Sequence, residues 1–182
     1  MDDTREPLSV ETIARAAEHV VDGEGMPALT MRRLGRELGV EAMSIYHHIP
    51  NKAALEDVLA TRLLSPTGEV PPTNSPLDVV EWYARAIRSV LRAHPRRLPL
   101  VSGRLPAQLF DAPAPQAVLT TLLDAGFDHS AAAWILDALV GYVIGHALVE
   151  RADVHATTDD DGAAFDTGLR FLLIGLRDEL GL

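Results

Sequence analysis

The sequence contains no cysteine, and aromatic residues make up only 5% of it. A chain without cysteine has neither disulfides nor thiolate chemistry, which fits a reducing compartment. The first residues, Met1 to Ser9, are polar and acidic and lack the apolar core of a signal peptide, so we expect a cytoplasmic protein. At 182 residues and 47% apolar content, the chain is long enough for one or two small domains with packed cores.

Positive charge is also scarce. The net charge of -10 excludes a protein that coats nucleic acid with its whole surface. The segment from Thr30 to Lys52 is different, because it has four cations against two acids and leaves -12 on the rest of the chain. The four cations are Arg32, Arg33, Arg36 and Lys52. An acidic body with one basic patch would approach DNA through that patch.

No part of the chain shows the alternation of apolar and polar residues that is typical of strands, so we predict an all-α fold. The stretch from Ser65 to Pro76 has four prolines and no periodicity, which indicates a linker. We therefore expect two domains, residues 1–64 and residues 65–182. The first should be a three-helix domain with a helix-turn-helix, followed by a connecting helix.

The helices of the N-terminal part are predicted from caps and breakers. Ser9 caps a first helix that Gly23 and Gly25 end. Gly39 permits a left-handed turn between two short helices, which is the pattern of a helix-turn-helix. The three helices after the first are expected at Met31–Leu38, Glu41–His48 and Lys52–Leu64.

Cations stand at the starts of two of these helices. Arg32 and Arg33 follow the cap residue Thr30, and Lys52 follows the cap residue Asn51. Helix N-termini favour negative charge, so cations there indicate an external anion, and phosphate is the usual one. The short helix between them carries residues suited to a DNA groove. The segment is therefore predicted to bind DNA.

The C-terminal part is predicted to contain helices over Leu77–His94, Gln116–Ala125 and Ser130–Arg151, and a last one from about Phe165 to Leu180. Residues 95–115 hold five prolines and should form short helical fragments at most. The run from Ala131 to Val149 is almost wholly apolar, but Asp137 and His146 interrupt it. In a membrane, these two polar side chains would lie in the hydrocarbon region, which costs free energy. Packing against a partner helix avoids that cost, so no membrane is expected.

Two helices lack a partner within the chain. Gly141 and Gly145 are four residues apart, which lets another backbone approach closely, and the last helix has a leucine stripe. We expect a homodimer held by a four-helix bundle. Its predicted interface comprises Gly141, Gly145, Leu169, Leu172, Leu173 and Leu176.

The C-terminal part also holds aromatic residues with polar tips. They are either ordinary core or the lining of an effector pocket, which needs apolar walls and a few hydrogen-bonding groups. The candidate ligand-binding residues are Trp82, Tyr83, Ile87, Leu91, Leu105, Phe110, Trp134, Ala138, Tyr142 and His146.

Three segments, ARAAEHVVDGEG, LTMRRLGRELGV and SIYHHIPNKAAL, are similar to the DNA-binding domain of the TetR family of bacterial repressors. The rest resembles the C-terminal domain of the tetracycline-repressor branch, through AHP, SGRLP, LLDAGF, LVGYVIGHALVE and FDTGLRFLLIGL. The resemblance implies a homodimer that binds operator DNA and a small-molecule effector. It also identifies the last two long helices as dimer helices.

The family pattern implies a role for individual residues of the DNA-binding part. Thr30 and Arg32 match phosphate-contacting positions, and Ala42, Met43 and Ser44 lie where the recognition helix meets base edges. Positions that touch backbone phosphates are matched by Tyr46, His47 and Lys52, with His48 nearby. Ala42 and Met43 offer only apolar contact, so direct readout of bases should be sparse.

In the tetracycline-responsive branch, the loop that matches LVSGRLP contributes a histidine to a metal–drug chelate. Here Val101 and Ser102 stand in that loop, and it has no histidine. We therefore expect no metal and no cofactor, and an apolar effector.

The main hypothesis is a repressor released from its operator by a small molecule. An enzyme with an incidental helix-turn-helix is one alternative, although the chain has no nucleophile elbow, phosphate loop or HExxH motif. A DNA-binding protein without an effector is the other.

Overall fold

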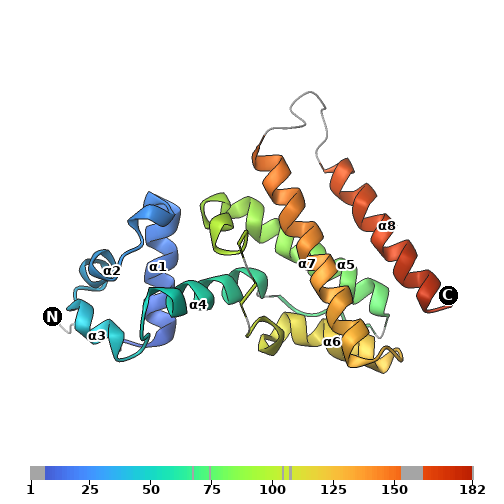
Figure 1. The fold of residues 1–182 in the computed structure, drawn as a ribbon, viewed down its shortest axis with the longest axis horizontal. Coiled ribbons are helices and arrows are strands. Elements are labelled where there is room, and N and C mark those ends of the chain that lie inside the picture. The colour runs from blue at the N-terminus through green and yellow to red at the C-terminus, as the bar shows by residue number, and fades with distance from the viewer. Residues whose placement is uncertain are drawn as a thin grey trace.

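The computed structural model describes residues 7–66, 68–73, 75–103, 105–106, 108–152 and 162–181. All the regular secondary structure in that part is helical, as predicted (Figure 1). The α-helices are α1 (Val10–Glu24), α2 (Met31–Leu38), α3 (Ala42–Tyr46), α4 (Lys52–Leu64), α5 (Pro76–Ala93), α6 (Pro113–Asp124), α7 (His129–Arg151) and α8 (Ala163–Glu179). Short 3-10 turns lie at η1 (Met26–Ala28), η2 (Pro95–Leu100) and η3 (Leu109–Asp111).

The cap residues predicted for three N-terminal helices are confirmed. Ser9 begins α1 with a capping box, in which its hydroxyl accepts a hydrogen bond from the Thr12 N–H. The Thr30 hydroxyl accepts from the third residue of α2 at 3.1 Å, and the Asn51 carboxamide accepts from the third residue of α4 at 2.8 Å. Each cap satisfies an N–H that the helix itself leaves unpaired.

The four helices of the C-terminal part begin one to three residues before their predicted starts, and for α6 and α7 the cause is clear. α6 begins at Pro113 and not at Gln116, because proline at the first helical position loses no hydrogen bond that the helix needs. α7 is capped by Asp128 and not by Ser130, since the Asp128 carboxylate accepts from the Ala131 N–H at 2.8 Å. The predicted short helix Glu41–His48 is confirmed over Ala42–Tyr46.

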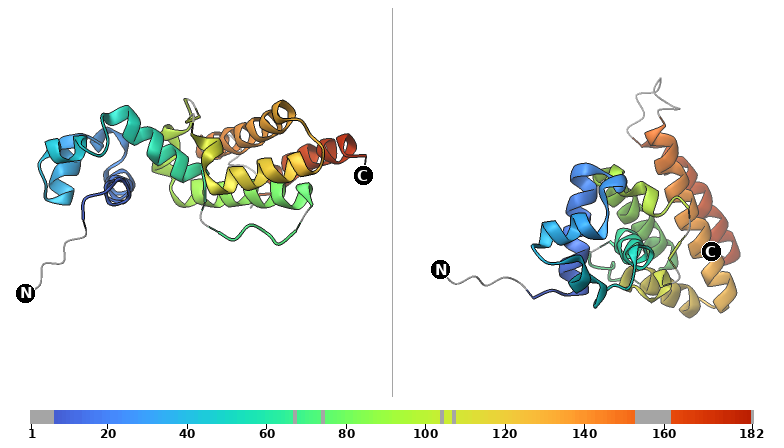
Figure 2. Two further views of the ribbon diagram at one scale, coloured as in Figure 1. Left: turned by 90° about the horizontal axis from the view of Figure 1, so that it is seen from below. Right: turned by 60° about the vertical axis from the view of Figure 1, so that its left-hand side comes forward.

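The chain has two hydrophobic cores, and α4 contributes to both. Helices α1, α2 and α3 enclose the first core together with Leu55 and Leu59 of α4. Leu63 and Leu64, at the other end of α4, belong to the second core. In Figure 1 and in the left view of Figure 2, α4 runs from the group formed by α1 to α3 into the group formed by α5 to α8. A change in the packing of either core would therefore move α4.

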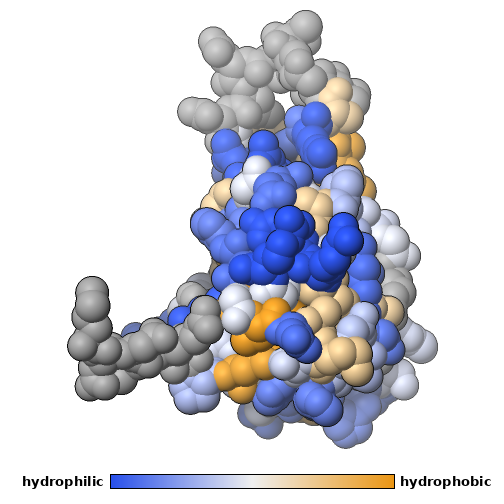
Figure 3. All heavy atoms as spheres, turned by 90° about the vertical axis from the view of Figure 1, so that its left-hand side faces the viewer, coloured by the Kyte–Doolittle hydropathy of each residue, from blue (hydrophilic) through white to orange (hydrophobic). Residues whose placement is uncertain are grey.

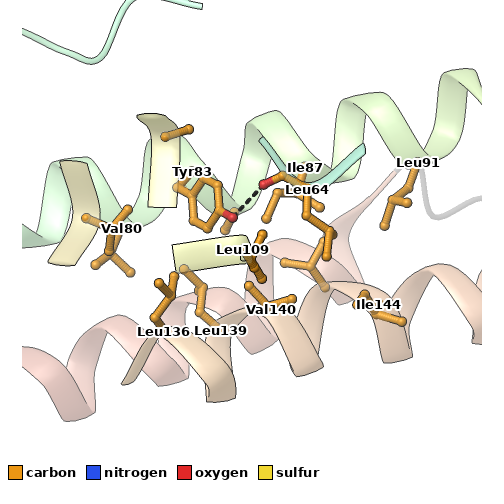
Figure 4. Packing of buried hydrophobic residues seen from close by; sticks show 14 of the residues in the cluster. Leu64, Val80, Tyr83, Ile87, Leu91, Leu109, Leu136, Leu139, Val140 and Ile144 are labelled. Atoms are coloured by element: carbon orange, nitrogen blue, oxygen red, sulfur yellow. Dashed lines mark hydrogen bonds between the residues drawn. The ribbon is translucent and has the colours of Figure 1, made fainter. Parts of the chain in front are cut away.

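The second core surrounds α5, which contacts α6, α7 and α8. Figure 4 shows Val80, Tyr83 and Ile87 of α5 facing Leu136 and Val140 of α7. α7 is also long and apolar enough to cross a membrane by length and composition alone. Its buried residues, among them Leu136 and Val140, pack into the second core, so one side of α7 faces protein in the described part of the chain.

Candidate DNA interface and ligand-binding residues

The turn between α2 and α3 depends on two glycines. Gly39 adopts the left-handed conformation at a φ of 63°, where side chains are disfavoured. Gly35 lies so close to the start of α3 that a Cβ atom on it would be 2.8 Å from the Val40 carbonyl oxygen. The Val40 N–H donates to the Gly35 carbonyl at 2.9 Å across the same contact. The angle between α2 and α3 is therefore set by backbone packing.

α3 is anchored by one side chain and exposes others. Ile45 is completely buried in the first core. Met43 is 65% exposed and Tyr46 is 41% exposed, so the side opposite Ile45 faces solvent. Ala42 and Ser44 are partly exposed beside them. The residues predicted to meet base edges thus lie on or beside the open side of a fixed helix.

The predicted phosphate-contacting cations are exposed at two helix starts. Arg32 follows the cap of α2, and Lys52 follows the cap of α4, where its ammonium lies 3.5 Å from the Glu56 carboxylate. Exposed pairs of this kind contribute little to stability. Both cations remain accessible to an anion that approaches the helix N-termini.

Arg33 has a different role from Arg32. Its guanidinium donates to the Glu24 carboxylate at 2.6 Å and to the Glu37 carboxylate at 2.8 Å. The hydrogen bond that Glu24 accepts, and then the one that Glu37 accepts, raise the pKa of Arg33. Arg33 therefore ties α2 to the end of α1.

His47 and His48 are exposed directly after α3, and Thr30 is exposed before α2. This end of the molecule is mainly hydrophilic, with a small hydrophobic area (Figure 3). Within the described ranges, no three His, Asp or Glu side chains gather as metal ligands.

The predicted effector residues lie in three different places. Tyr83, Ile87 and Leu91 are buried in the second core, where the Tyr83 hydroxyl donates to the Leu64 carbonyl at 2.6 Å (Figure 4). Burial raises the pKa of Tyr83, so its hydroxyl stays protonated as a donor. Trp82, Leu105 and Phe110 are partly buried against the same core.

Tyr142 and His146 gather around the start of α8. The Tyr142 hydroxyl donates to the Phe165 carbonyl at 2.6 Å, and the His146 ring meets the Phe165 ring edge-on at 5.3 Å. The Arg88 guanidinium also lies over the Phe165 ring, 4.5 Å from its centre. These residues hold α8 against α5 and α7 in the described structure.

Trp134 and Ala138 lie apart from the other candidate ligand residues in the described structure. Trp134 is 70% exposed on α7, and Ala138 is exposed one turn later. Ala138 lines a small groove between α7 and α8 with Phe171 and Gly175. Both residues project away from the side of α7 that packs on α5.

Some of the predicted dimer residues are exposed in the single chain, and others are buried in its core. A Cβ atom on Gly141 or Gly145 would meet nothing within 4 Å, and Leu172 is exposed. Leu169 and Leu176 are instead buried in the second core of their own chain, with Leu173 partly buried beside them. In the single chain, the predicted interface residues of α8 therefore lie on two sides of the helix, with Leu172 on the exposed side.

α8 has a second apolar side that sequence reasoning missed. Phe171 is 66% exposed and Ile174 is 54% exposed. They follow Leu169 and Leu173 by two and one residues, so they point away from the buried stripe. The sequence did contain a signal for this side: α8 has apolar residues in two stripes, and packing within one chain can bury only one of them.

Comparisons with known proteins agree with this geometry. Residues 13–57 match the family described as "Bacterial regulatory proteins, tetR family", and residues 71–160 match "Tetracyclin repressor-like, C-terminal domain". The chain is 31% identical to the class E tetracycline repressor protein of Escherichia coli, over 80% of this chain and 70% of the relative. It is 33% identical to the class C protein of the same organism, over 80% and 67%.

A solved structure shows the same architecture. TetR-Q116A from Acinetobacter baumannii AYE, crystallised in complex with minocycline, superposes with a TM-score of 0.74 and 28% sequence identity. The superposition covers 96% of this chain and 99% of the other. The helix-turn-helix, the helical C-terminal half and these matches lead to one conclusion. The chain belongs to the tetR family of bacterial regulatory proteins, which are DNA-binding transcriptional regulators and not enzymes.

Proposed function

We propose that this chain represses transcription in the cytoplasm as a homodimer that binds an inverted-repeat operator and leaves it when a small molecule binds. The observation that carries this proposal is the exposed side of α3 between two cationic helix starts. Met43 and Tyr46 face solvent, with Arg32 and Lys52 at the flanking N-termini. A helix presented in this way fits the major groove, and the flanking cations fit phosphates.

The exposed apolar residues of α7 and α8 support the homodimer. Trp134, Phe171 and Ile174 form exposed apolar area beside the open glycines Gly141 and Gly145. Apolar area of this kind on a soluble chain marks an interaction surface. In the proposed dimer, it joins two chains and presents two copies of α3 to DNA.

The link between Tyr83 and Leu64 supports the proposed release. Leu64 is the last residue of α4, and its carbonyl accepts the Tyr83 hydroxyl. An apolar effector that inserts beside Trp82 and Ile87 would displace this contact and move α4, together with the first core. The minocycline complex of the Acinetobacter relative supports a small-molecule effector for this chain. The effector must bind the DNA-incompetent form more tightly, because equal affinity for both forms shifts nothing.

Selection from random duplex DNA tests this function. We expect a palindromic motif whose half-sites are about one helical turn apart, or a multiple of it. Affinity for that motif should fall steeply as salt rises, because phosphate contacts release counterions. A selected motif without two-fold symmetry would count against the proposal. Binding that no candidate ligand weakens would instead favour a DNA-binding protein without an effector.

A further inference from the structure

α7 has an apolar side that the described part of the chain leaves uncovered. Trp134 is 70% exposed on it. Ala138, Gly141 and Gly145 are also exposed. Residues three or four positions apart lie on the same side of a helix, so these four residues form a single stripe, which we call the open stripe. It lies opposite the side of α7 that packs into the second core.

The side chains of the open stripe differ greatly in size. Trp134 carries an indole at one end of the stripe, whereas the other three positions carry a methyl group or only hydrogen. A Cβ atom on Gly141 or Gly145 would meet nothing within 4 Å, so these positions are hollows in an open surface. A surface with a projecting side chain and hollows fits a second surface on which their positions are exchanged.

The spacing of the open stripe reads the same in both directions, because its steps are four, three and four residues. Two copies of α7 that pack antiparallel across a two-fold axis therefore bring the stripe onto itself. Trp134 of each copy then meets the partner's Gly145, and Ala138 meets the partner's Gly141. The indole faces a hollow at both ends, and the small residues between them let the two backbones approach closely. A parallel pair would instead place indole against indole and glycine against glycine.

The outline of the chain is compatible with this arrangement. In Figure 1, α1 to α3 lie at one end of the long axis of the molecule, and α7 runs obliquely across that axis. A two-fold axis close to the long axis places the two copies of α7 in opposed directions and keeps both groups of α1 to α3 at the same end. Both copies of α3 would then face one DNA duplex.

The neighbouring side of α8 extends the apolar surface. Phe171 is 66% exposed, and it lines a groove between α7 and α8 together with Gly175 and Ala138 of the open stripe. Every residue that lines this groove is apolar except Glu179. A helix that lies on the open stripe would therefore also cover Phe171, which adds buried apolar area to the contact.

We propose that the open stripe binds the open stripe of a second copy of this chain in one antiparallel register, with the indole of Trp134 on the partner's Gly145. The inference rests on the homodimer of the proposed function and deepens it, because it specifies the register and the side chain that anchors it. It also assigns Trp134 to the contact between chains and not to the effector site. Tryptophan is among the side chains that contribute most to binding at protein interfaces.

An exchange of the two side chains tests the register. Trp134→Gly removes the indole, and Gly145→Trp sets a second indole against the first, so each single change should raise the dissociation constant of the dimer at least about tenfold. The double exchange Trp134→Gly/Gly145→Trp again pairs each indole with a glycine. Sedimentation velocity over a dilution series should find its dissociation constant within about fivefold of the wild-type value.

Trp134→Gly/Gly141→Trp is the matched control, because it has the same composition as the double exchange. Its new indole would meet the partner's Ala138, where there is no hollow, so the dimer should stay as weak as in the single variants. All of the substituted positions are open in the single chain, so each variant should keep the helix content of the wild type by circular dichroism.

The fluorescence of Trp134 gives an independent measurement. The chain has two tryptophans, so Trp82→Phe leaves Trp134 as the only one. Its emission should lie at a shorter wavelength in the dimer and shift to a longer wavelength when dilution separates the chains, because the indole is covered only by the partner.

Two results would overturn the register in a wild type that is dimeric. One is a double exchange that binds as weakly as the matched control, and the other is a Trp134 emission that dilution leaves unchanged. A dimeric wild type that binds no operator would overturn the proposed function alone, because sedimentation needs no DNA. A monomeric wild type would leave the open stripe to a different partner and would overturn both the homodimer and this inference.

Discussion

Gly35 is the residue on which the geometry of the helix-turn-helix depends. A methyl group there would meet the Val40 carbonyl oxygen at 2.8 Å and the Ala42 nitrogen at 3.3 Å, and both are backbone atoms. Gly35→Ala should therefore lower the free energy of unfolding by about 1–3 kcal/mol, as overpacking does elsewhere. Urea denaturation followed by circular dichroism measures the change.

Gly23→Ala is the matched control for Gly35→Ala. Gly23 lies within α1, and a Cβ atom there would meet nothing within 4 Å. This variant should gain about 0.5 kcal/mol, because alanine favours a helix more than glycine does. Equal stability of the two variants would show that α2 and α3 are not in close contact.

Asp22 links α1 to η2 through charge. Its carboxylate accepts from Arg97 at 2.6 Å and lies 3.0 Å from the His94 ring. Burial opposes the charged form, but the hydrogen bond and charge of Arg97, with the charge of His94, outweigh it and lower the pKa of Asp22. Its stabilising effect is therefore present above the ordinary pKa of 3.8 and is lost as pH falls through the lowered value.

Asp22→Asn removes this pH dependence. The melting temperature of the wild type should fall more steeply than that of the variant as the pH is lowered below about 4. At neutral pH the variant should be the less stable of the two. Asp124→Asn, which neutralises an exposed carboxylate of α6, serves as the control and should follow the wild type. Parallel curves for the wild type and Asp22→Asn would contradict the ion pair.

At the scale of helices, α3 and α4 should contribute differently to DNA binding. Lys52 stands at the start of α4 and fits a phosphate, so Lys52→Ala should weaken binding to all sequences alike and reduce the salt slope by about one unit. Ser44 lies on α3, and Ser44→Ala should change base preference at one symmetric pair of positions. Competition assays with operator variants at several salt concentrations distinguish the two effects. If Lys52→Ala and Ser44→Ala lost the same affinity for every DNA sequence, α3 would not lie in the major groove of the DNA.

At the scale of the whole molecule, the proposed dimer rests on the open sides of α7 and α8. Gly145 has empty space around it in the single chain, so Gly145→Glu should leave the chain folded. In a dimer the same glutamate would be buried without a partner, at a cost of several kcal/mol. Light scattering should therefore find monomers of Gly145→Glu with native helix content and without specific operator binding.

Leu176→Glu provides the contrast to Gly145→Glu. Leu176 is buried in the second core, so a charge there should unfold the C-terminal half and not merely separate two chains. A monomeric Gly145→Glu protein with full operator affinity would remove dimerisation from the mechanism.

The sequence alone determined the features that depend on neighbouring residues. Caps at Ser9, Thr30 and Asn51, the left-handed turn at Gly39 and the all-helical fold are local, because each depends on hydrogen bonds or dihedral angles within a few residues. The resemblance to the family was also visible in the sequence, through motifs in both parts of the chain. Helix starts at Pro113 and Asp128 were placed less well, since more than one residue near each could begin the helix.

Only the tertiary structure decided which side of each apolar helix is buried. α7 and α8 are apolar on more than one side, so periodicity could not separate Trp134 from Leu136, or Phe171 from Leu169. Packing against α5 selects one side and leaves the other open. A groove lined by Glu11 of α1, Arg62 of α4 and Ala114 of α6 was equally hidden, because these residues are up to about a hundred positions apart in sequence. Such a site exists only when non-local packing brings those helices together, and no local pattern records it.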